Sequence, residues 1–273
     1  MPASLQQIIA ATRSRVAESK LRADVPALEK AAAGHVPRGF RRALAIESNA
    51  GPAVIAELKK ASPSRGLIRA DFDVEKLARE LESAGATALS VLTDEQFFQG
   101  SLGNLRRASA GTRLPCLRKD FIVDEFQLLE ARASCADAVL LIVAALSQAD
   151  LISLASRAHH YALDVLCEVH DESELQRALE AGFDLIGVNN RDLRTFKVDI
   201  QTAITLAGSM PKNAIRVAES GIHTGVDIAQ LRAAGYQAFL IGESLMKAES
   251  PGDALRHLLT EAVAAAAPVR ASV

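Results

Sequence analysis

The fold is decided by a stretch that recurs in variant form along the chain, ESELQRALEAGFDLIGVNNR at residues 172–191. Its first ten residues are mostly helix formers with apolar residues three and four positions apart, which predicts an amphipathic helix. The phrase at 181–184, Ala-Gly-Phe-Asp, supplies a glycine that ends a helix in the left-handed conformation. The apolar run 185–188 then predicts a buried strand, with polar residues directly after it. The stretch is therefore one helix–strand unit.

The same kind of unit occurs eight times from about residue 50 onward. Helical stretches such as 74–84, 125–133 and 226–233 separate the apolar runs. Strands that are apolar on both faces and alternate with helices favour a parallel sheet covered by helices. The predicted strands are residues 53–58, 86–92, 115–118, 138–143, 164–168, 185–188, 215–218 and 238–241.

Two folds share this alternation. A doubly wound sheet typically has a Gly-x-Gly-x-x-Gly turn after its first strand, and the sequence has none. Eight units in about 220 residues match a (β/α)8 TIM barrel. We expect residues 1–273 to form a single domain, with an N-terminal helical extension (1–48) packed on a barrel (49–273). The alanine-rich segment after Thr260 predicts a last helix.

Composition limits the function. The 31 Lys and Arg nearly balance the 33 Asp and Glu, and the chain has no Trp, two Tyr and nine Phe, which argues against nucleic-acid binding. Cys116, Cys135 and Cys167 are widely spaced, and no His-Glu-x-x-His motif occurs, so neither disulfides nor a metal is expected. The apolar run 138–146 is shorter than the roughly 20 residues of a membrane span, and the polar N-terminus does not fit a signal peptide. We expect a cytoplasmic protein with no membrane contact.

Polar side chains gather where the predicted strands end, which in this barrel is where active sites lie. Glu57 and Lys59 are two positions apart, so they share one face of a strand. Each residue taken alone has an ordinary explanation as a surface charge or turn former. Together they indicate a functional barrel mouth: Glu57 and Lys59, Lys119 and Asp120, Glu168, Asn189 to Arg191, Glu219 to Gly221, and Gly242 to Ser244.

The last two strand ends indicate the ligand. The loops at Ser220-Gly221 and Gly242-Glu243 offer backbone N–H groups just before helices, as phosphate-binding loops of such barrels do. The segment 62–66 either closes over the site or is a plain surface turn. Lysine beside carboxylates predicts acid–base chemistry on a phosphorylated carbonyl compound. Carboxylates such as Glu57 would keep a lysine acid charged, whereas a Schiff-base lysine needs a lowered pKa, and the sequence leaves both roles open.

At these residues the chain resembles the indole-3-glycerol-phosphate synthase family. The resemblance extends over about residues 38–247, with the phrases in order at the predicted strand ends. The phrases are IAELKKASPS (55–64), SVLTDEQFFQGS (90–101), LRKDF (117–121), CEVH (167–170), GVNNRDL (187–193) and AESGI (218–222).

The resemblance implies ring closure of 1-(2-carboxyphenylamino)-1-deoxy-D-ribulose 5-phosphate to indole-3-glycerol phosphate, with loss of CO₂ and water, in tryptophan biosynthesis. No cofactor is implied. Lys119 resembles the general acid, Lys59 the group that holds the substrate carboxylate, and Glu168 and Glu57 the later acid and base, with their division open.

The remaining implied roles concern binding. Asn189, Glu219, Arg191 and Ser220 would orient the substrate. Ser62, Lys59, Gly221, Gly242 and Glu243 would hold its phosphate, and Phe98, Phe121 and Leu193 would hold its aromatic ring.

Two rival functions stay open. A Schiff-base aldolase of the same fold would use Lys119 as a nucleophile, and a non-catalytic barrel would only bind a sugar phosphate. We expect a monomer that binds a phosphorylated small molecule; association with other enzymes of the tryptophan pathway and motion of the 60–70 loop are left open.

Overall fold

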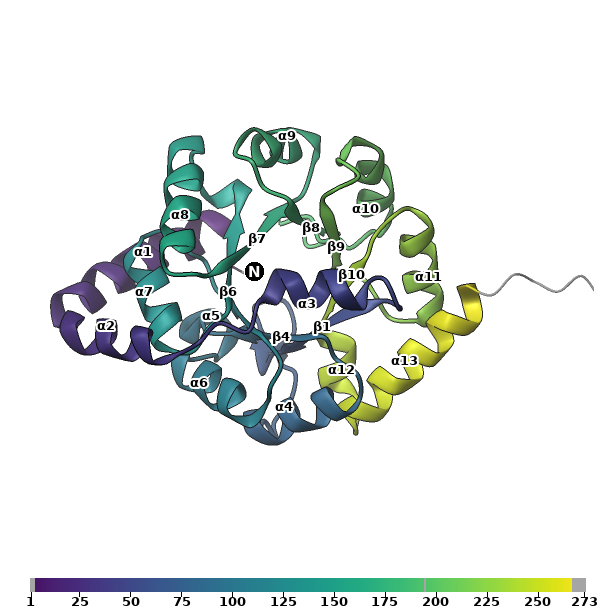
Figure 1. The fold of residues 1–273 in the computed structure, drawn as a ribbon, viewed down its shortest axis with the longest axis horizontal. Coiled ribbons are helices and arrows are strands. Elements are labelled where there is room, and N and C mark those ends of the chain that lie inside the picture. The colour runs from purple at the N-terminus through teal and green to yellow at the C-terminus, as the bar shows by residue number, and fades with distance from the viewer. Residues whose placement is uncertain (1–2, 194, 267–273) are drawn as a thin grey trace, which may run out of the picture.

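The computed structural model describes residues 3–193 and 195–266, and its centre is a closed barrel of eight parallel strands (Figure 1). The predicted (β/α)8 barrel is confirmed. Its strands, in sequence order, are β1 (Ala53–Leu58), β4 (Ala88–Leu92), β5 (Cys116–Lys119), β6 (Ala138–Ile142), β7 (Asp164–Val169), β8 (Leu185–Asn189), β9 (Ile215–Glu219) and β10 (Ala238–Ile241).

Helices cover the outside of the barrel. They are α4 (Val74–Ser83), α6 (Leu102–Gly111), α7 (Phe126–Ala133), α8 (Gln148–His160), α9 (Glu172–Glu180), α10 (Gln201–Leu206), α11 (Gly225–Ala233) and α13 (Pro251–Ala266). Short elements lie in the loops: α5 (Glu95–Phe98), α12 (Glu243–Lys247), and the 3-10 turns Val143–Ala145 and Ala207–Ser209. The helix predicted after Thr260 is the end of α13, and the part of that segment beyond residue 266 lies outside the described residues.

Several predicted strand ends were wrong by one or two residues. The second strand begins at Ala88 because the backbone N–H of Ala86 still donates to Leu81 at the end of α4. Val143 belongs to a 3-10 turn and not to β6. The strands β8 and β9 run one residue further than predicted, so Asn189 and Glu219 lie within paired strands. Their side chains therefore start from a fixed backbone.

The strand β1 shows how the barrel separates its two apolar cores. Val54, Ala56 and Leu58 point outward, into the cluster between the strands and the covering helices. Ala53 and Ile55 point inward, into a second cluster inside the barrel. This alternation follows from the period of two along a strand, and it turns the next inward position toward the barrel mouth.

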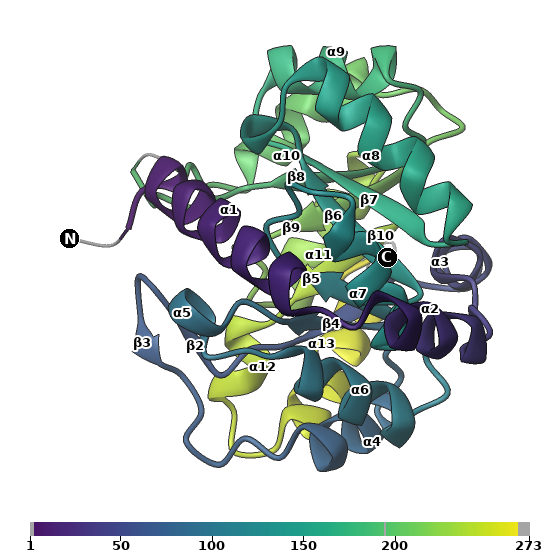
Figure 2. The ribbon, with the colours of Figure 1, turned by 90° about the vertical axis from the view of Figure 1, so that its left-hand side faces the viewer.

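Residues 3–48 place helices at both ends of the barrel. The helix α3 (Phe40–Glu47) crosses one end, where fully buried Phe40 and Leu44 complete the inner cluster (Figure 1). Figure 2 shows α1 (Leu5–Arg22) on the opposite side of the barrel, beside α5 and the hairpin of β2 (Ala61–Ser62) and β3 (Gly66–Leu67). The hairpin occupies the loop whose structure the sequence left open. The helix α2 (Val25–Gly34) packs on α7.

The connection between α2 and α3 is fixed by one buried carboxylate. Asp137, just before β6, accepts hydrogen bonds from the backbone N–H of Cys116 at 2.7 Å and of Arg38 at 2.7 Å, and Nε2 of His35 lies 3.0 Å away. A buried carboxylate is stable only with such partners. Asp137 therefore binds the N-terminal segment to the barrel wall.

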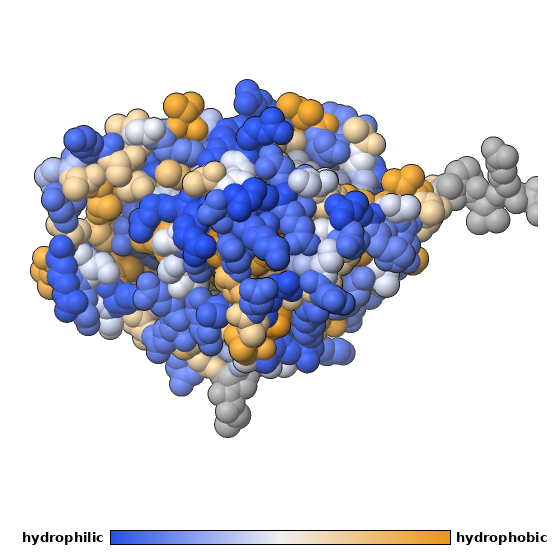
Figure 3. All heavy atoms as spheres, turned by 90° about the horizontal axis from the view of Figure 1, so that it is seen from below, coloured by the Kyte–Doolittle hydropathy of each residue, from blue (hydrophilic) through white to orange (hydrophobic). Residues whose placement is uncertain are grey.

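The exposed surface carries few large apolar groups. On the face in Figure 3, hydrophilic side chains predominate and hydrophobic ones are scattered. Within residues 3–193 and 195–266, no helix is both long and apolar enough to cross a membrane.

We predict that Phe40→Ala lowers the free energy of unfolding by about 3–5 kcal/mol, because it leaves a cavity under the barrel where the ring is fully buried. Chemical denaturation measures this change. Ile46→Ala is the control, since Ile46 lies on the same helix and is 65% exposed. Equal stability of the two variants would contradict the role given to Phe40.

Candidate active site

A cavity of about 290 Å³ opens at the carboxyl ends of the barrel strands. Its lining includes all fifteen residues to which the family resemblance assigns a role, so the barrel brings together side chains that lie almost 190 positions apart. They are Glu57, Lys59, Ser62, Phe98, Lys119, Phe121, Glu168, Asn189, Arg191, Leu193, Glu219, Ser220, Gly221, Gly242 and Glu243.

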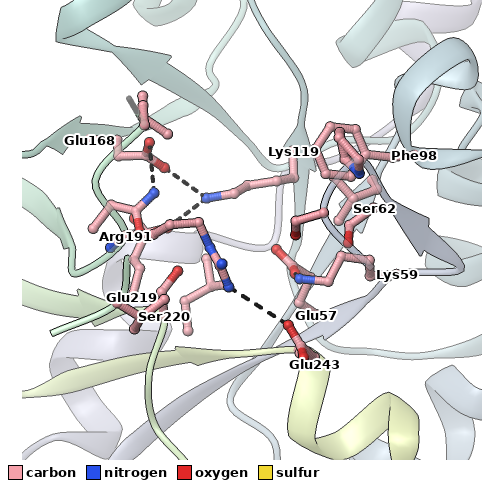
Figure 4. A pocket seen from close by; sticks show the side chains of 18 of the residues that line it. Glu57, Lys59, Ser62, Phe98, Lys119, Glu168, Arg191, Glu219, Ser220 and Glu243 are labelled. Atoms are coloured by element: carbon pink, nitrogen blue, oxygen red, sulfur yellow. Dashed lines mark hydrogen bonds and ion pairs between the residues drawn. The ribbon is translucent and has the colours of Figure 1, made fainter. Parts of the chain in front are cut away.

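Lys119 spans the cavity from the end of β5 (Figure 4). Its Nζ lies 3.0 Å from Oε2 of Glu168 and 2.5 Å from Oε2 of Glu219. Burial alone would lower the pKa of Lys119, but the negative charges of Glu168, Glu219 and Glu57 outweigh burial and raise it above its usual value. Lys119 is therefore a stably protonated ammonium.

The pKa values of the two partners of Lys119 shift in opposite directions. Burial would raise the pKa of Glu168, but Lys119 and His170 outweigh it and lower this pKa. Burial also raises the pKa of Glu219; Lys119 opposes this without cancelling it, and the charge of Glu168 adds to it. Glu219 thus holds a proton more readily than Glu168. Its Oε1 is buried without a hydrogen-bond partner among the described residues and lies close to Gly187.

Glu168 is held from two further directions. Asn189 donates from Nδ2 to Oε1 of Glu168 at 3.2 Å, and Nε2 of His170 lies 3.3 Å from the same oxygen. On its other side, Nδ1 of His170 lies 2.9 Å from Oε2 of Glu174. The sequence did not single out His170 as a site residue; its position two residues after Glu168, directly after β7, was the available signal.

Glu57 and Lys59 form a separate pair across the cavity. Nζ of Lys59 lies 2.6 Å from Oε1 of Glu57, as their shared strand face predicts. As expected, the charge of Glu57 helps to raise the pKa of Lys119, but Glu168 and Glu219 contribute more, and the hydrogen bond of Glu57 goes to Lys59.

Two glycines make room for these carboxylates. A Cβ on Gly187 of β8 would overlap Oε1 of Glu219, and a Cβ on Gly242 would lie 2.5 Å from Oε1 of Glu57. Both distances are shorter than real Cβ contacts allow. Each glycine therefore permits a close approach of a neighbouring strand's carboxylate.

The cavity has an apolar side. The rings of Phe98 and Phe121 lie with their centroids 6.2 Å apart and are tilted by 40°. Leu193 lines the same cavity, and so do Leu5 and Ile8 of α1, which the sequence did not connect with the site. Their spacing of three residues identifies one helix face, but only the tertiary contact shows what that face covers.

The cavity also carries charges and unpaired polar groups. Glu243 lies 3.1 Å from Nε of Arg65 and 3.7 Å from Nη2 of Arg191, so two loops and α12 meet there (Figure 4). Oγ of Ser62 is buried without a hydrogen-bond partner in the described chain. Ser220 and Gly221 adopt left-handed conformations, with φ of 64° and 77°, which turn the chain sharply after β9.

Two residues that the sequence placed in the functional mouth, Asn190 and Asp120, are engaged in structural hydrogen bonds. Asn190 donates to the backbone oxygen of Ser220 and accepts from the N–H of Ala203, which fixes the loop after β8. Asp120 is held by Thr93 and Arg118. No group of three or more His, Cys, Asp or Glu side chains within the described residues is arranged to hold a metal ion.

A ring of paired lysines and carboxylates at the mouth of a parallel (β/α)8 barrel, beside an apolar slot, defines a barrel enzyme of the acid–base class. The indole-3-glycerol phosphate synthase family model matches residues 5–258. The chain belongs to the indole-3-glycerol phosphate synthase family, and is thus a carbon–carbon lyase of the carboxy-lyase type in tryptophan biosynthesis.

Named relatives agree over nearly the whole chain. An indole-3-glycerol phosphate synthase of Koribacter versatilis is 62% identical over 259 residues, which cover 95% of this chain and 100% of the relative. One of Acidithiobacillus ferrooxidans is 50% identical over 256 residues, 93% of this chain and 97% of the relative.

More distant solved structures share the fold alone. A thiamine phosphate pyrophosphorylase from Pyrococcus furiosus has a TM-score of 0.60 at 16% identity, covering 81% of this chain and 100% of that one. A mandelate oxidase with benzoyl-formic acid has a TM-score of 0.60 at 17% identity, covering 78% of this chain and 72% of that one.

We predict that Gly187→Ala lowers kcat by about a hundredfold, because the new methyl group must push Glu219 away from Lys119. Steady-state kinetics measure the change. Gly208→Ala is the control, since nothing lies within 4 Å of the Cβ it would add. Full activity of Gly187→Ala would contradict the close packing assigned to Glu219.

We predict that His170→Gln destabilises the protein in a pH-dependent way. Burial lowers the pKa of His170, but Glu168 and Glu174 outweigh burial and raise it from 6.5 to about 10. Because the native state binds the proton more tightly than the unfolded state, this stabilisation is complete below pH 6.5 and is lost as the pH rises to about 10. The Tm difference between wild type and variant should therefore shrink from pH 6.5 to 10. A difference independent of pH would contradict the ion-pair assignment.

Proposed function

We propose that the residues of this cavity catalyse the ring closure of 1-(2-carboxyphenylamino)-1-deoxy-D-ribulose 5-phosphate, with Lys119 as the general acid. The observation that carries this assignment is the position of the Lys119 ammonium, which lies between Glu168 and Glu219 in the barrel mouth. A general acid must keep its proton until the reacting oxygen needs it, and these two carboxylates hold that proton in place.

The reaction begins with carbon–carbon bond formation. The ring carbon that bears the carboxylate attacks the ribulose carbonyl carbon, and Lys119 donates its proton to the carbonyl oxygen as that oxygen gains charge. Loss of CO₂ then returns the bonding electrons to the ring system. No oxidant or reductant is required, so the reaction balances without a redox cofactor.

Dehydration completes the indole. One carboxyl group protonates the departing hydroxyl while a carboxylate removes a proton from the five-membered ring. Glu57 and Glu168 lie on opposite sides of Lys119, which supports a division of these two tasks between them (Figure 4). Glu168 lies within hydrogen-bond distance of Nζ of Lys119, so it can also return a proton to that group.

The remaining lining residues bind the substrate. Lys59 holds the substrate carboxylate until CO₂ leaves, and Phe98, Phe121 and Leu193 hold the aromatic ring. Asn189, Arg191, Glu219 and Ser220 orient the hydroxyl groups. Ser62, Lys59 and the backbone at Gly221, Gly242 and Glu243 bind the phosphate. The unpaired hydroxyl of Ser62 supports this, because a buried donor is stabilised by an acceptor that the ligand supplies.

The charge state of Lys119 favours the acid over the Schiff-base nucleophile. A nucleophilic lysine needs a lowered pKa, and the carboxylates around Lys119 raise it. The rival function, a barrel that only binds a sugar phosphate, does not require Glu57, Lys119 and Glu168 to converge. Burying these charged groups costs free energy, which favours a catalytic role for them.

We further propose that residues 1–273 form one domain that acts as a cytoplasmic monomer, without metal, nucleic acid or membrane. Light scattering tests the monomer. Co-purification with other enzymes of the tryptophan pathway tests whether it associates with them.

We predict that Lys119→Ala lowers kcat by about 10²–10⁴-fold with a small change in KM, because the phosphate and ring contacts remain. The chain contains no Trp, so indole fluorescence reports the product without a protein indole background. Lys212→Ala is a matched control at an exposed lysine. Turnover like wild type would contradict the assignment, and a borohydride-trapped adduct on Lys119 would favour the aldolase.

A further inference from the structure

One face of helix α1 turns toward the cavity. Leu5 and Ile8 line the cavity, Thr12 is buried, and Arg15 follows three residues later. Spacings of three and four residues place these four side chains on one side of the helix. Arg15 therefore extends the cavity-facing side of α1.

Arg15 reaches two buried carboxylates at once. Its Nη2 lies 3.3 Å from Oδ2 of Asp94 and 3.5 Å from Oδ1 of Asp120. The side chain of Asp94 is 2% exposed and that of Asp120 is fully buried. Nη2 of Arg15 is itself buried and makes no aligned hydrogen bond among the described residues, so the contact is an ion pair.

Each of these carboxylates fixes the backbone that carries one ring of the apolar slot. Asp94 caps α5 by accepting a hydrogen bond from the N–H of Phe97 at 2.7 Å, directly before Phe98. Asp120 accepts from the N–H of Phe121 at 2.9 Å. The positions of both rings thus depend on carboxylates that Arg15 contacts.

Arg15 is also needed for charge balance. Asp120 has a second cation, since Nη2 of Arg118 lies 2.9 Å from its Oδ2. Arg15 is the one cation within ion-pair distance of Asp94 in the described part of the chain. Burial raises the pKa of Asp94, the nearby charge of Asp120 adds to this, and Arg15 opposes it. Loss of Arg15 would leave two neighbouring buried carboxylates with only Arg118 beside them.

We propose that Arg15 is a positioning residue for the aromatic-ring slot: through Asp94 and Asp120 it fixes the segments that carry Phe98 and Phe121 and makes helix α1 part of substrate binding. The inference rests on the proposed function, because the slot is assigned to the ring of that substrate.

A purely structural anchor is the alternative to exclude. Lys20 also ties α1 to the barrel, since its Nζ lies 3.0 Å from Oδ1 of Asp124, but this pair is partly exposed and does not line the cavity. Arg13 lies on the exposed side of the same helix. Lys20→Gln therefore removes an ion pair between α1 and the barrel, and Arg13→Gln removes a positive charge from α1. Neither substitution changes a residue that contacts the ring slot.

The experiment compares Arg15→Gln, Lys20→Gln and Arg13→Gln in the full chain. Steady-state kinetics give kcat and KM for the ribulose phosphate substrate, and inhibition gives Ki for anthranilate and for inorganic phosphate. Arg15→Gln should lower kcat/KM by about tenfold or more, because a displaced ring slot misaligns the attacking carbon. Ki for anthranilate should rise with it, while Ki for phosphate stays within twofold; both controls should match wild type.

Two outcomes overturn the proposal. One is an Arg15→Gln variant that matches Lys20→Gln in every constant, and the other is an equal rise of Ki for anthranilate and phosphate. If wild type binds anthranilate and phosphate in calorimetric titrations but does not turn over the substrate, the proposed function fails, and the two dissociation constants from those titrations still test Arg15.

Asp94→Asn gives an independent test that does not depend on the folding of one variant. Asparagine retains the helix cap but removes the charge. If Arg15 acts through this carboxylate, Arg15→Gln should have at most a twofold further effect on Ki for anthranilate in the Asp94→Asn background. Independent, multiplying effects would overturn the coupling. Arg15→Lys should recover part of the anthranilate affinity, and no recovery in a variant with wild-type Tm would count against an ion pair.

Discussion

The buried ammonium of Lys119 is the interaction on which the barrel mouth depends. Glu168 and Glu219 come from strands β7 and β9, and each is nearly inaccessible to solvent. Two such carboxylates repel one another and lose their hydration, so they are stable together only with a cation between them. Lys119 supplies it from β5, across the barrel. Because all three start from paired strands of a closed sheet, their spacing is set by the backbone and not by flexible loops.

The sequence predicted this arrangement where local periodicity determines it. Eight apolar runs predicted the barrel, and polar residues after six of these runs predicted the mouth, because parallel strands end on the same side. The Glu57–Lys59 pair followed from the period of two along a strand. The predicted strand bounds were wrong where a hydrogen bond to a neighbouring element sets the true end of the strand, as the bond from Ala86 to α4 does.

Pairings between distant segments could not be predicted in this way. Nothing near Glu168 in the sequence shows that Asn189 holds it in place, or that the ammonium beside it comes from Lys119. The role of Gly187 was hidden for the same reason: a glycine in a strand indicates a close approach, but only the neighbouring strand shows that the approaching group is Glu219. Register within a closed sheet is a property of the whole fold.

Two kinds of structural element hold the groups of this site in place. Charged groups that must hold a proton at a fixed point lie at strand ends, where displacement would require a change in the barrel. The apolar slot is built instead from α5, the segment after β5 and the cavity face of α1, which are joined by the Arg15 ion pairs. Because the carboxylates of these ion pairs are buried, breaking the pairs would leave their two negative charges with only Arg118 beside them among the described residues. The slot is therefore fixed by contacts between one helix and two loop segments, whereas the charged groups are fixed by the strand ladder of the barrel.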